Sequence, residues 1–179
     1  MAAVVSRGRR TDSEGPKQVR VLMVCLGNIC RSPTAHGVLE KLIKNEGLSH
    51  LIEVDSAGTG DWHIGASPDV RSVAAAAQRG YDLTALRARQ VTLPDFERFD
   101  YLLAMDRTNL KDLRSLCPQA HRPKLHLLLE FADTSHEAVP DPYYSGEDGF
   151  ELVLNLAEEA CEGFLAHLRK HHALEVRAS

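Results

Sequence analysis

The chain has 179 residues, of which 44% are hydrophobic and 26% charged, and its formal net charge is −4. This length suits one domain with a sizeable core, and the composition is that of an ordinary globular protein. The charge gives no reason to expect nucleic-acid binding, and no apolar run is long enough to cross a bilayer, so we expect neither nucleic acid nor membrane as a partner.

The first 18 residues are rich in arginine, glycine and polar side chains and offer little to bury. Their opening apolar stretch is too short for a secretory signal. An organelle-targeting peptide is the alternative to a flexible extension, although Asp12 and Glu14 argue against it. We therefore expect a flexible extension over 1–18, one folded domain over 19–173 and a short tail over 174–179.

A buried strand and a tight turn open the expected domain. The apolar, β-branched run at 19–24 predicts a strand that ends at Cys25. Gly27 and Asn28 follow, and these residue types tolerate a positive φ. The Ser-Pro pair at 32–33 then resembles the N-cap and first position of a helix. A strand thus brings a thiol into a loop before a helix N-terminus, where backbone N–H groups and the helix dipole bind anions.

Arg31 adds a planar guanidinium that matches phosphate oxygens two at a time. A helix N-terminus and a nearby arginine favour the thiolate of Cys25, which predicts attack on phosphorus and a cysteinyl-phosphate intermediate. The loop N–H groups and Arg31 would stabilise charge on the equatorial oxygens. A buried structural cysteine is the alternative, but strand, thiol, turn, arginine and helix all occur in the order that the chemistry needs.

The next elements alternate between helix and strand. Apolar residues at helical spacing predict a helix over 35–43 that ends near Gly47 and covers one face of the sheet. Residues 51–58 predict a second strand, where Ser56 is either a hydrogen-bond partner inside the site or bonded to its own turn. The loop after it holds the only tryptophan, Trp62, whose polar neighbours favour a position beside a bound ring over one in the core.

The middle of the chain repeats this alternation. The Ser-Pro pair at 67–68 predicts the start of a helix that ends at Gly80. Residues 86–91 are interpreted as a short strand or a loop return. Another buried strand over 99–105 leads to Asp106, which suits a helix N-cap better than a catalytic acid.

The last third contains a helix stopped by Pro118, a strand candidate over 124–129 and a long polar loop over 132–149. Loops of this length are commonly functional or disordered, and this one holds Asp141. An amphipathic helix over 150–168 follows.

Cys161 lies on the apolar side of this helix and is expected to be inert core. His167, His171 and His172 have partial metal-like spacing, but a solvated helix end is the better interpretation, because histidine suits the dipole there. We expect no metal and no cofactor.

Alternating strands and helices predict an α/β fold with three layers. We expect a doubly wound, mostly parallel four-stranded sheet with helices on both faces, right-handed crossovers and a phosphate-binding loop after the first strand. Ligands of such sheets bind at the carboxyl ends of the strands. Cys25, Ser56 and Asp106 all fall at such ends.

Two motifs resemble the low-molecular-weight protein tyrosine phosphatases. The first is the signature Cys25-Leu26-Gly27-Asn28-Ile29-Cys30-Arg31-Ser32-Pro33, and the second is the general-acid loop Asp141-Pro142-Tyr143-Tyr144. Softer matches lie at 55–59, 87–90 and 104–106, so the resemblance covers nearly the whole chain from Val19. It implies hydrolysis of phosphotyrosine proteins or small aryl phosphates, with substrate bound by the signature loop, namely Leu26, Gly27, Asn28, Ile29, Cys30 and Ser32.

The resemblance also assigns expectations outside the signature. Asp141 would protonate the leaving phenolate and then activate the water that hydrolyses the intermediate, although a plain Asp-Pro turn is the alternative. Tyr143 and Tyr144 would stack on the phenyl ring with Trp62, at the mouth of the cleft. In the family a serine at the position of Ser56 supports the loop asparagine.

One position departs from the family pattern, because members often carry a histidine where Leu86 stands. This departure removes one hydrogen-bonding anchor and leaves the chemistry untouched.

Three other functions are alternatives to phosphotyrosine hydrolysis. Relatives that resemble phosphoarginine phosphatases place a threonine where Ile29 stands, and the apolar Ile29 favours an aryl phosphate. An arsenate reductase on the same fold needs two further cysteines close together on a mobile segment, whereas Cys117 and Cys161 fall on separate predicted helices. A phosphotyrosine-binding module without turnover is opposed by the intact set of Cys25, Arg31 and Asp141.

Two interpretations of Cys30 stay open. It either forms a reversible disulfide with Cys25 under peroxide, or it contributes a backbone N–H with an incidental side chain. Four cysteines with two in one loop do not form a disulfide framework, and a reducing cytoplasm fits because Cys25 must stay free. Phosphate and sulfate-like oxyanions are expected to inhibit, and the oligomeric state is not predicted.

Overall fold

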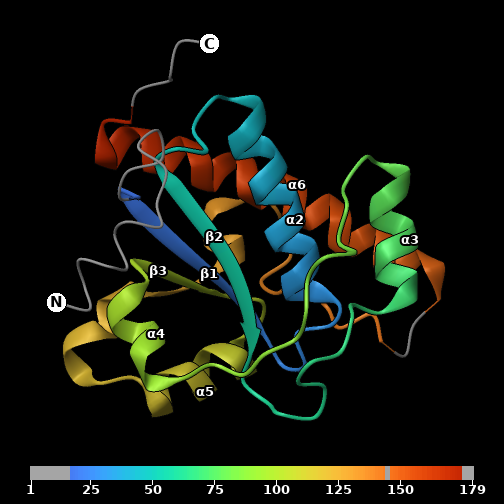
Figure 1. Cartoon of the computed structure of the whole chain (residues 1–179), viewed down its shortest axis with the longest axis horizontal. Helices are drawn as coiled ribbons and strands as arrows, with labels where there is room; N and C mark the ends of the chain where they lie inside the picture. The colour runs from blue at the N-terminus through green and yellow to red at the C-terminus, as the bar shows by residue number, and fades with distance from the viewer. Residues whose placement is uncertain (1–16, 144–145, 175–179) are drawn as a thin grey trace, which may run out of the picture.

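The computed structural model describes residues 17–143 and 146–174. Within them a four-stranded sheet has the order β2-β1-β3-β4, and every neighbouring pair is parallel (Figure 1). The strands are β1 (Val19–Cys25), β2 (Ile52–Gly58), β3 (Tyr101–Ala104) and β4 (Leu125–Leu127). The predicted parallel α/β sheet is therefore confirmed.

The strand β1 lies inside the sheet and is buried on both faces, as its near-continuous apolar sequence requires. Val21 and Met23 point into one half of the core, and Leu22 and Val24 point into the other. This alternation follows from the two-residue period of a strand.

Helices cover both faces of the sheet, so the predicted three layers are present (Figure 1). One face carries α2 (Arg31–Asn45) and the long α6 (Glu147–His172), with α3 (Val70–Gln78) beside them. The other face carries α4 (Leu93–Arg98) and α5 (Arg107–Leu116). Two short 3-10 helices, η1 (Gln119–Lys124) and η2 (Leu128–Phe131), flank β4.

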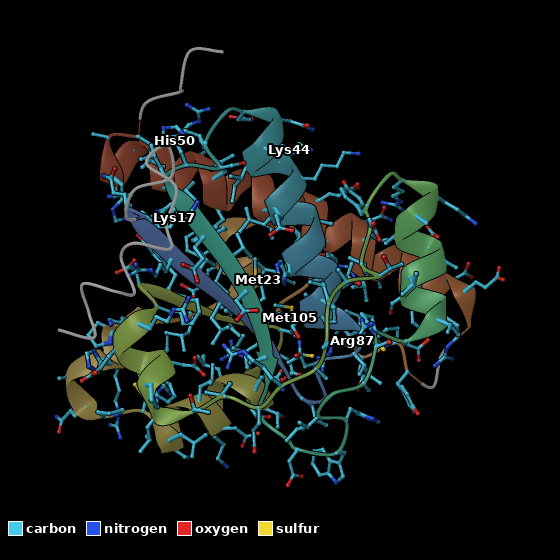
Figure 2. The ribbon with its side chains drawn as sticks, viewed as in Figure 1. Lys17, Met23, Lys44, His50, Arg87 and Met105 are labelled. Atoms are coloured by element: carbon cyan, nitrogen blue, oxygen red, sulfur yellow. The ribbon has the colours of Figure 1, made fainter. Side chains whose placement is uncertain are left out.

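The signature loop lies at the carboxyl end of the sheet. Figure 2 shows Arg87 near this end of the molecule, whereas Lys17 and His50 lie at the opposite end. Lys17 Nζ donates to the Ser49 carbonyl at 2.6 Å, and the Gln18 side chain donates to the His172 carbonyl at 2.8 Å. The C-terminal end of α6 is therefore tied to the start of β1, far from the loop that follows Cys25.

Two expectations about the elements were wrong, and one helix was missed. The helix α3 begins after Asp69, whose carboxylate accepts from Arg71 N at 2.8 Å, so the pair at 67–68 does not cap it. The strand β4 has three residues instead of six, because the chain turns into η2. The helix α4 was not predicted, although Thr92 N donates to the Asp95 side chain in a capping box.

None of the helices in the described part of the chain is long and apolar enough to span a membrane.

Candidate active site

The loop between β1 and α2 folds around the sulfur of Cys25. Asn28 has a φ of 58°, a left-handed conformation that asparagine tolerates, and its backbone N–H points at Cys25 Sγ at 3.3 Å. The Ser32 hydroxyl lies 3.1 Å from the same sulfur. The sulfur therefore lies within hydrogen-bond distance of one backbone N–H and one hydroxyl of the loop.

Gly58 at the end of β2 lets the loop approach the sheet closely. A Cβ at this position would lie 2.6 Å from the Leu26 carbonyl oxygen, so no larger residue fits without a shift of the backbone. The next two residues, Thr59 and Gly60, donate their N–H groups to the carbonyls of Cys25 and Leu26, both at 2.9 Å. The loop is therefore fixed on its outer side by the end of β2.

Asn28 is buried and connects the loop to two other segments. Its Nδ2 donates to Ser32 Oγ at 2.8 Å, and its Oδ1 accepts from Arg89 N at 3.0 Å. The expectation that Ser56 supports this asparagine is wrong, because the Ser56 hydroxyl lies 3.3 Å from Nδ1 of the buried His36.

The expected cap of α2 was also wrong. The residue before the helix is Cys30, which makes no side-chain capping bond, and Ser32 is already helical. The Ser32 hydroxyl instead contacts Cys25 and Asn28, because the first turn of the helix wraps around the sulfur. The N-terminus of α2, the end of a helix that attracts anions, therefore lies beside the sulfur of Cys25.

Arg31 is the first residue of α2, and its side chain is buried. Nη1 donates to Asp106 Oδ2 at 2.6 Å and to the Val139 carbonyl at 3.0 Å. Nη2 lies 3.8 Å from Asp141 Oδ2. One side of the guanidinium is therefore held by the protein, and the other faces the loop that contains Asp141.

The segment with Asp141 is attached to the sheet through Val139, whose N–H donates to the Met105 carbonyl at 2.8 Å. Asp141 Oδ1 accepts from Tyr143 N at 3.0 Å, so Asp141 forms a local turn, as in the alternative interpretation, and also faces the pocket. The same carboxylate faces Arg31 across the site with about half of its side chain exposed. Tyr144 lies outside the described residues.

These segments enclose a pocket of about 370 Å³. Its lining residues are Cys25, Leu26, Gly27, Ile29, Cys30, Arg31, Trp62, His63, Asp141 and Tyr143. Asn28 and Ser32 do not line the pocket, because their side chains hold the loop from behind. Among the described residues, the pocket therefore brings together the other members of the set expected from the sequence.

Two side chains form the outer part of the pocket. The Trp62 indole is 68% exposed and lies over Gly60, where a Cβ would come within 1.9 Å of the ring. His63 lies against Gly27, where a Cβ would be 2.9 Å from the imidazole, and its ring centre is 6.5 Å from that of Tyr143. His63 was not singled out from the sequence, since its proximity to the loop follows only from the fold.

Cys30 is buried beside the pocket, and this burial raises the pKa of its thiol to about 12, although a hydrogen bond with Ser72 acts in the opposite direction. Cys25 and Cys30 are both free thiols in this structure. Cys30 is thus held in its thiol form at neutral pH, whatever its role in oxidation.

The histidines near the end of α6 pack partly against the body of the protein instead of lying in solvent. His172 Nε2 is 2.8 Å from the Tyr101 hydroxyl, and the His167 ring centre is 5.1 Å from that of Phe131. Only His171 of the three is exposed. Among residues 17–143 and 146–174, no group of three metal-ligating side chains is placed to hold a metal ion.

Comparisons with known proteins agree with this geometry. Residues 20–174 match the family described as low molecular weight phosphotyrosine protein phosphatase. A low molecular weight protein-tyrosine-phosphatase of Streptomyces coelicolor is 44% identical over 155 residues, which cover 84% of this chain and 94% of the relative.

Two solved structures are similar in fold. A protein tyrosine phosphatase of Entamoeba histolytica, with Hepes in its active site, has a TM-score of 0.84 at 39% identity and covers 86% of this chain and 99% of its own. An arginine phosphatase of Drosophila has a TM-score of 0.77 at 34% identity and covers 83% and 97%. The match to the family over nearly the whole folded part, with its pocket built around Cys25, means that this chain belongs to the low-molecular-weight protein tyrosine phosphatases.

Proposed function

We propose that the chain hydrolyses phosphotyrosine and small aryl phosphates with Cys25 as nucleophile, Arg31 as the stabiliser of the transferring phosphoryl group and Asp141 as general acid and base. One observation carries this proposal. The sulfur of Cys25, the guanidinium of Arg31 and the carboxyl of Asp141 line one pocket, at the N-terminus of α2.

In the first step the Cys25 thiolate attacks phosphorus, and the bond from phosphorus to the aryl oxygen breaks as the sulfur–phosphorus bond forms. Asp141 gives its proton to the leaving oxygen, so a neutral phenol departs. The loop N–H groups and Arg31 stabilise the negative charge on the three equatorial oxygens. Arg31 is suited to this task because Asp106 and the Val139 carbonyl fix its orientation before substrate arrives.

In the second step a water molecule attacks phosphorus from the side that the phenol has left. Asp141 takes the proton of this water, the sulfur–phosphorus bond breaks, and inorganic phosphate and the Cys25 thiolate are regenerated. The Ser32 hydroxyl, 3.1 Å from Cys25 Sγ, stabilises the sulfur as its negative charge returns.

We propose that the outer pocket selects the aryl group. Trp62, His63 and Tyr143 surround the space above Cys25, with Leu26 and Ile29 at its side, and Tyr144 is proposed to join them. A phosphotyrosine ring reaches from this aromatic rim to the sulfur, whereas a phosphoserine is too short to span the same depth.

Two substitutions test the assignment. Cys25→Ser is expected to abolish hydrolysis of p-nitrophenyl phosphate, and unchanged hydrolysis would refute the nucleophile. Asp141→Asn should lower kcat/KM by about 10²-fold for phenyl phosphate, whose leaving group is poor, and far less for 2,4-dinitrophenyl phosphate. An equal loss on both substrates would remove the acid role of Asp141.

Phosphoarginine hydrolysis is a second candidate, because an arginine phosphatase shares the fold and a third of its sequence. Ile29 lines the pocket and offers no hydrogen bond to a guanidinium, which favours the aryl substrate. We expect a phosphotyrosine peptide to be hydrolysed faster than a phosphoarginine peptide, and Ile29→Thr to narrow the difference. If the unmodified protein hydrolysed the phosphoarginine peptide faster, phosphoarginine would replace phosphotyrosine as the proposed substrate.

Arsenate reduction is disfavoured by the positions of the remaining cysteines. Cys161 is fully buried in α6, where it contacts the Ala35 carbonyl, and Cys117 is buried at the end of α5. Burial raises the pKa of both thiols, which opposes their use in a thiolate relay. Stopped-flow reduction of arsenate with thioredoxin, without aryl phosphate hydrolysis, would overturn this choice.

We also propose inhibition by phosphate and sulfate-like oxyanions and a cytoplasmic location. The related Entamoeba enzyme holds Hepes, a sulfonate, in its active site, which supports the first proposal. The free thiols of Cys25 and Cys30 support the second, since a reducing compartment keeps the nucleophile available.

A further inference from the structure

Arg71, in the first turn of α3, is held in one orientation by the residue that caps this helix. Its Nε and Nη2 donate to the two carboxylate oxygens of Asp69 at 3.0 and 2.8 Å. The arginine in turn lowers the pKa of the Asp69 carboxyl. A two-point contact of this kind fixes the plane of a guanidinium as well as its position.

The same helix end is tied to the signature loop. Asp69 N donates to the carbonyl of Ile29 at 2.8 Å. Ile29 lies in the signature loop, four residues after Cys25. The position of the Arg71 guanidinium is therefore set relative to the phosphate-binding loop itself.

The guanidinium of Arg71 lies over two aromatic rings, of which Tyr143 lines the pocket. Its central carbon is 5.5 Å from the ring centre of Tyr143 and 4.8 Å from that of Phe150. Phe150 is buried in the first turn of α6, whereas Tyr143 belongs to the segment that carries Asp141. A cation and the face of an aromatic ring attract each other, so Arg71 holds the Tyr143 ring close to α3.

Tyr143 passes this restraint to the carboxyl group of Asp141, because Tyr143 N donates to Asp141 Oδ1 at 3.0 Å. A continuous series of contacts thus runs from Ile29 through Asp69, Arg71 and Tyr143 to Asp141. Arg71 itself is not among the residues that line the pocket.

We propose that Arg71 is a positioning residue for proton transfer, which sets the place of Asp141 relative to the signature loop. This inference rests on the proposed function, in which Asp141 protonates the leaving oxygen. The Arg71 side chain touches no reacting atom, and its effect is on how often the carboxyl group of Asp141 stands within reach of that oxygen.

Arg71→Ala is the first test. We expect kcat/KM for phenyl phosphate to fall about 10-fold, and that for 2,4-dinitrophenyl phosphate to fall less than about 2-fold, because only the poor leaving group needs the proton. The inhibition constant of inorganic phosphate should not change, since the signature loop binds phosphate without Asp141. Arg71→Lys keeps the charge but loses the planar two-point contact, so it should recover only part of the loss.

Arg98→Ala is the matched control. Arg98 also pairs with a carboxylate, that of Glu53, and its central guanidinium carbon lies 5.3 Å from the ring centre of Phe99. It belongs to α4, however, on the opposite face of the sheet from α3 (Figure 1). Its replacement should leave the ratio of the two substrates unchanged.

The double variant Arg71→Ala/Asp141→Asn decides whether Arg71 acts through Asp141. Without the carboxylic acid, the loss of Arg71 should cause no further decrease in kcat/KM for phenyl phosphate. A further decrease, or an equal effect of Arg71→Ala on both substrates, would overturn the inference while leaving the proposed function intact. If Asp141→Asn alone failed to separate the two substrates, the acid role would fall, and the inference with it.

Discussion

Arg31 Nη1 donates to Asp106 Oδ2 at 2.6 Å, while the other oxygen of this carboxylate caps α5 by accepting from Asn109 N at 2.7 Å. One carboxylate therefore orients the guanidinium and begins a helix. Because Asp106 follows β3 and Arg31 follows the loop after β1, the pairing of these neighbouring strands brings the two side chains together.

Asp106→Asn separates these two tasks. The amide keeps an oxygen for the cap but loses the charge that holds Arg31, so we expect kcat/KM for p-nitrophenyl phosphate to fall about 10-fold with little change in stability. Asp106→Ala should lose the same activity and also about 1 kcal/mol of unfolding free energy, because the cap is gone. Steady-state kinetics and urea unfolding measure both effects. An Asp106→Asn enzyme with full activity would contradict the orienting role.

The comparison of Asp106 with Ser56 explains what the sequence predicts and what it does not. The cap was predicted correctly, because it depends on residues within one turn of Asp106. The bond to Arg31 joins residues 75 positions apart and was not predicted, because local patterns carry no information about such distant partners. Ser56 was assigned to Asn28 by resemblance, yet it contacts His36, one turn into α2, which this chain places within reach of the hydroxyl.

The same reasoning covers the candidate site. The order of strand, Cys25, turn and helix is local and predicted the phosphate-binding loop, since each step has its own residue preference. The position of His63 on Gly27, and that of Arg71 beside Tyr143, depend on how separate loops pack against one another. Such positions are set by the assembled fold and leave no periodic pattern in the sequence.

Replacing Asn28 should lower both the stability and the activity of the protein. Alanine at its φ of 58° meets a steric penalty of roughly 1–2 kcal/mol, and both side-chain hydrogen bonds, each worth about 1 kcal/mol, disappear. We expect Asn28→Ala to lose about 3–4 kcal/mol in urea unfolding and most of its activity. Asn28→Gly relieves the backbone strain but does not restore the two hydrogen bonds. Its free energy of unfolding should therefore lie between those of the unmodified protein and Asn28→Ala. Equal stability of the alanine and glycine variants would show that the left-handed conformation costs nothing there.

Trp62 should contribute to substrate affinity and not to folding, because its ring is 68% exposed. An aromatic pair is worth about 0.5–1.5 kcal/mol, so Trp62→Ala should raise KM for phenyl phosphate roughly 2- to 10-fold. The inhibition constant of inorganic phosphate should be unchanged in Trp62→Ala, because phosphate has no ring to contact. The melting temperature should also be unchanged, because the indole is mostly exposed.

Gly60→Ala offers an independent test of the same ring position. The added methyl group would occupy the place of the indole, which must then swing away. We expect this variant to reproduce the KM of Trp62→Ala, and a normal KM would mean that the ring binds substrate from another position.

His167 should make the fold less stable in mild acid. The pKa of His167 is lowered first by partial burial and then by nearby positive charges, namely those of His171, His126, His172 and Lys170. One negative group lies nearby, because Glu130 pairs with His126. As pH falls below about 6.5, the unfolded chain takes up a proton that the folded chain resists, so the free energy of unfolding decreases until pH passes below the folded pKa. The contribution of His167 is therefore fully present above the unfolded pKa and lost below it.

Urea unfolding at pH 7.5 and 5.5 measures this effect in the unmodified protein, in His167→Asn and in a control, His136→Asn, whose imidazole is exposed. The asparagine variant loses the ring contact with Phe131 and should be less stable at both pH values, so the informative quantity is the difference between them. We expect that difference to shrink in His167→Asn and to persist in the control. An unchanged difference in His167→Asn would assign the acid sensitivity to other groups, because a residue that cannot titrate cannot contribute to the slope.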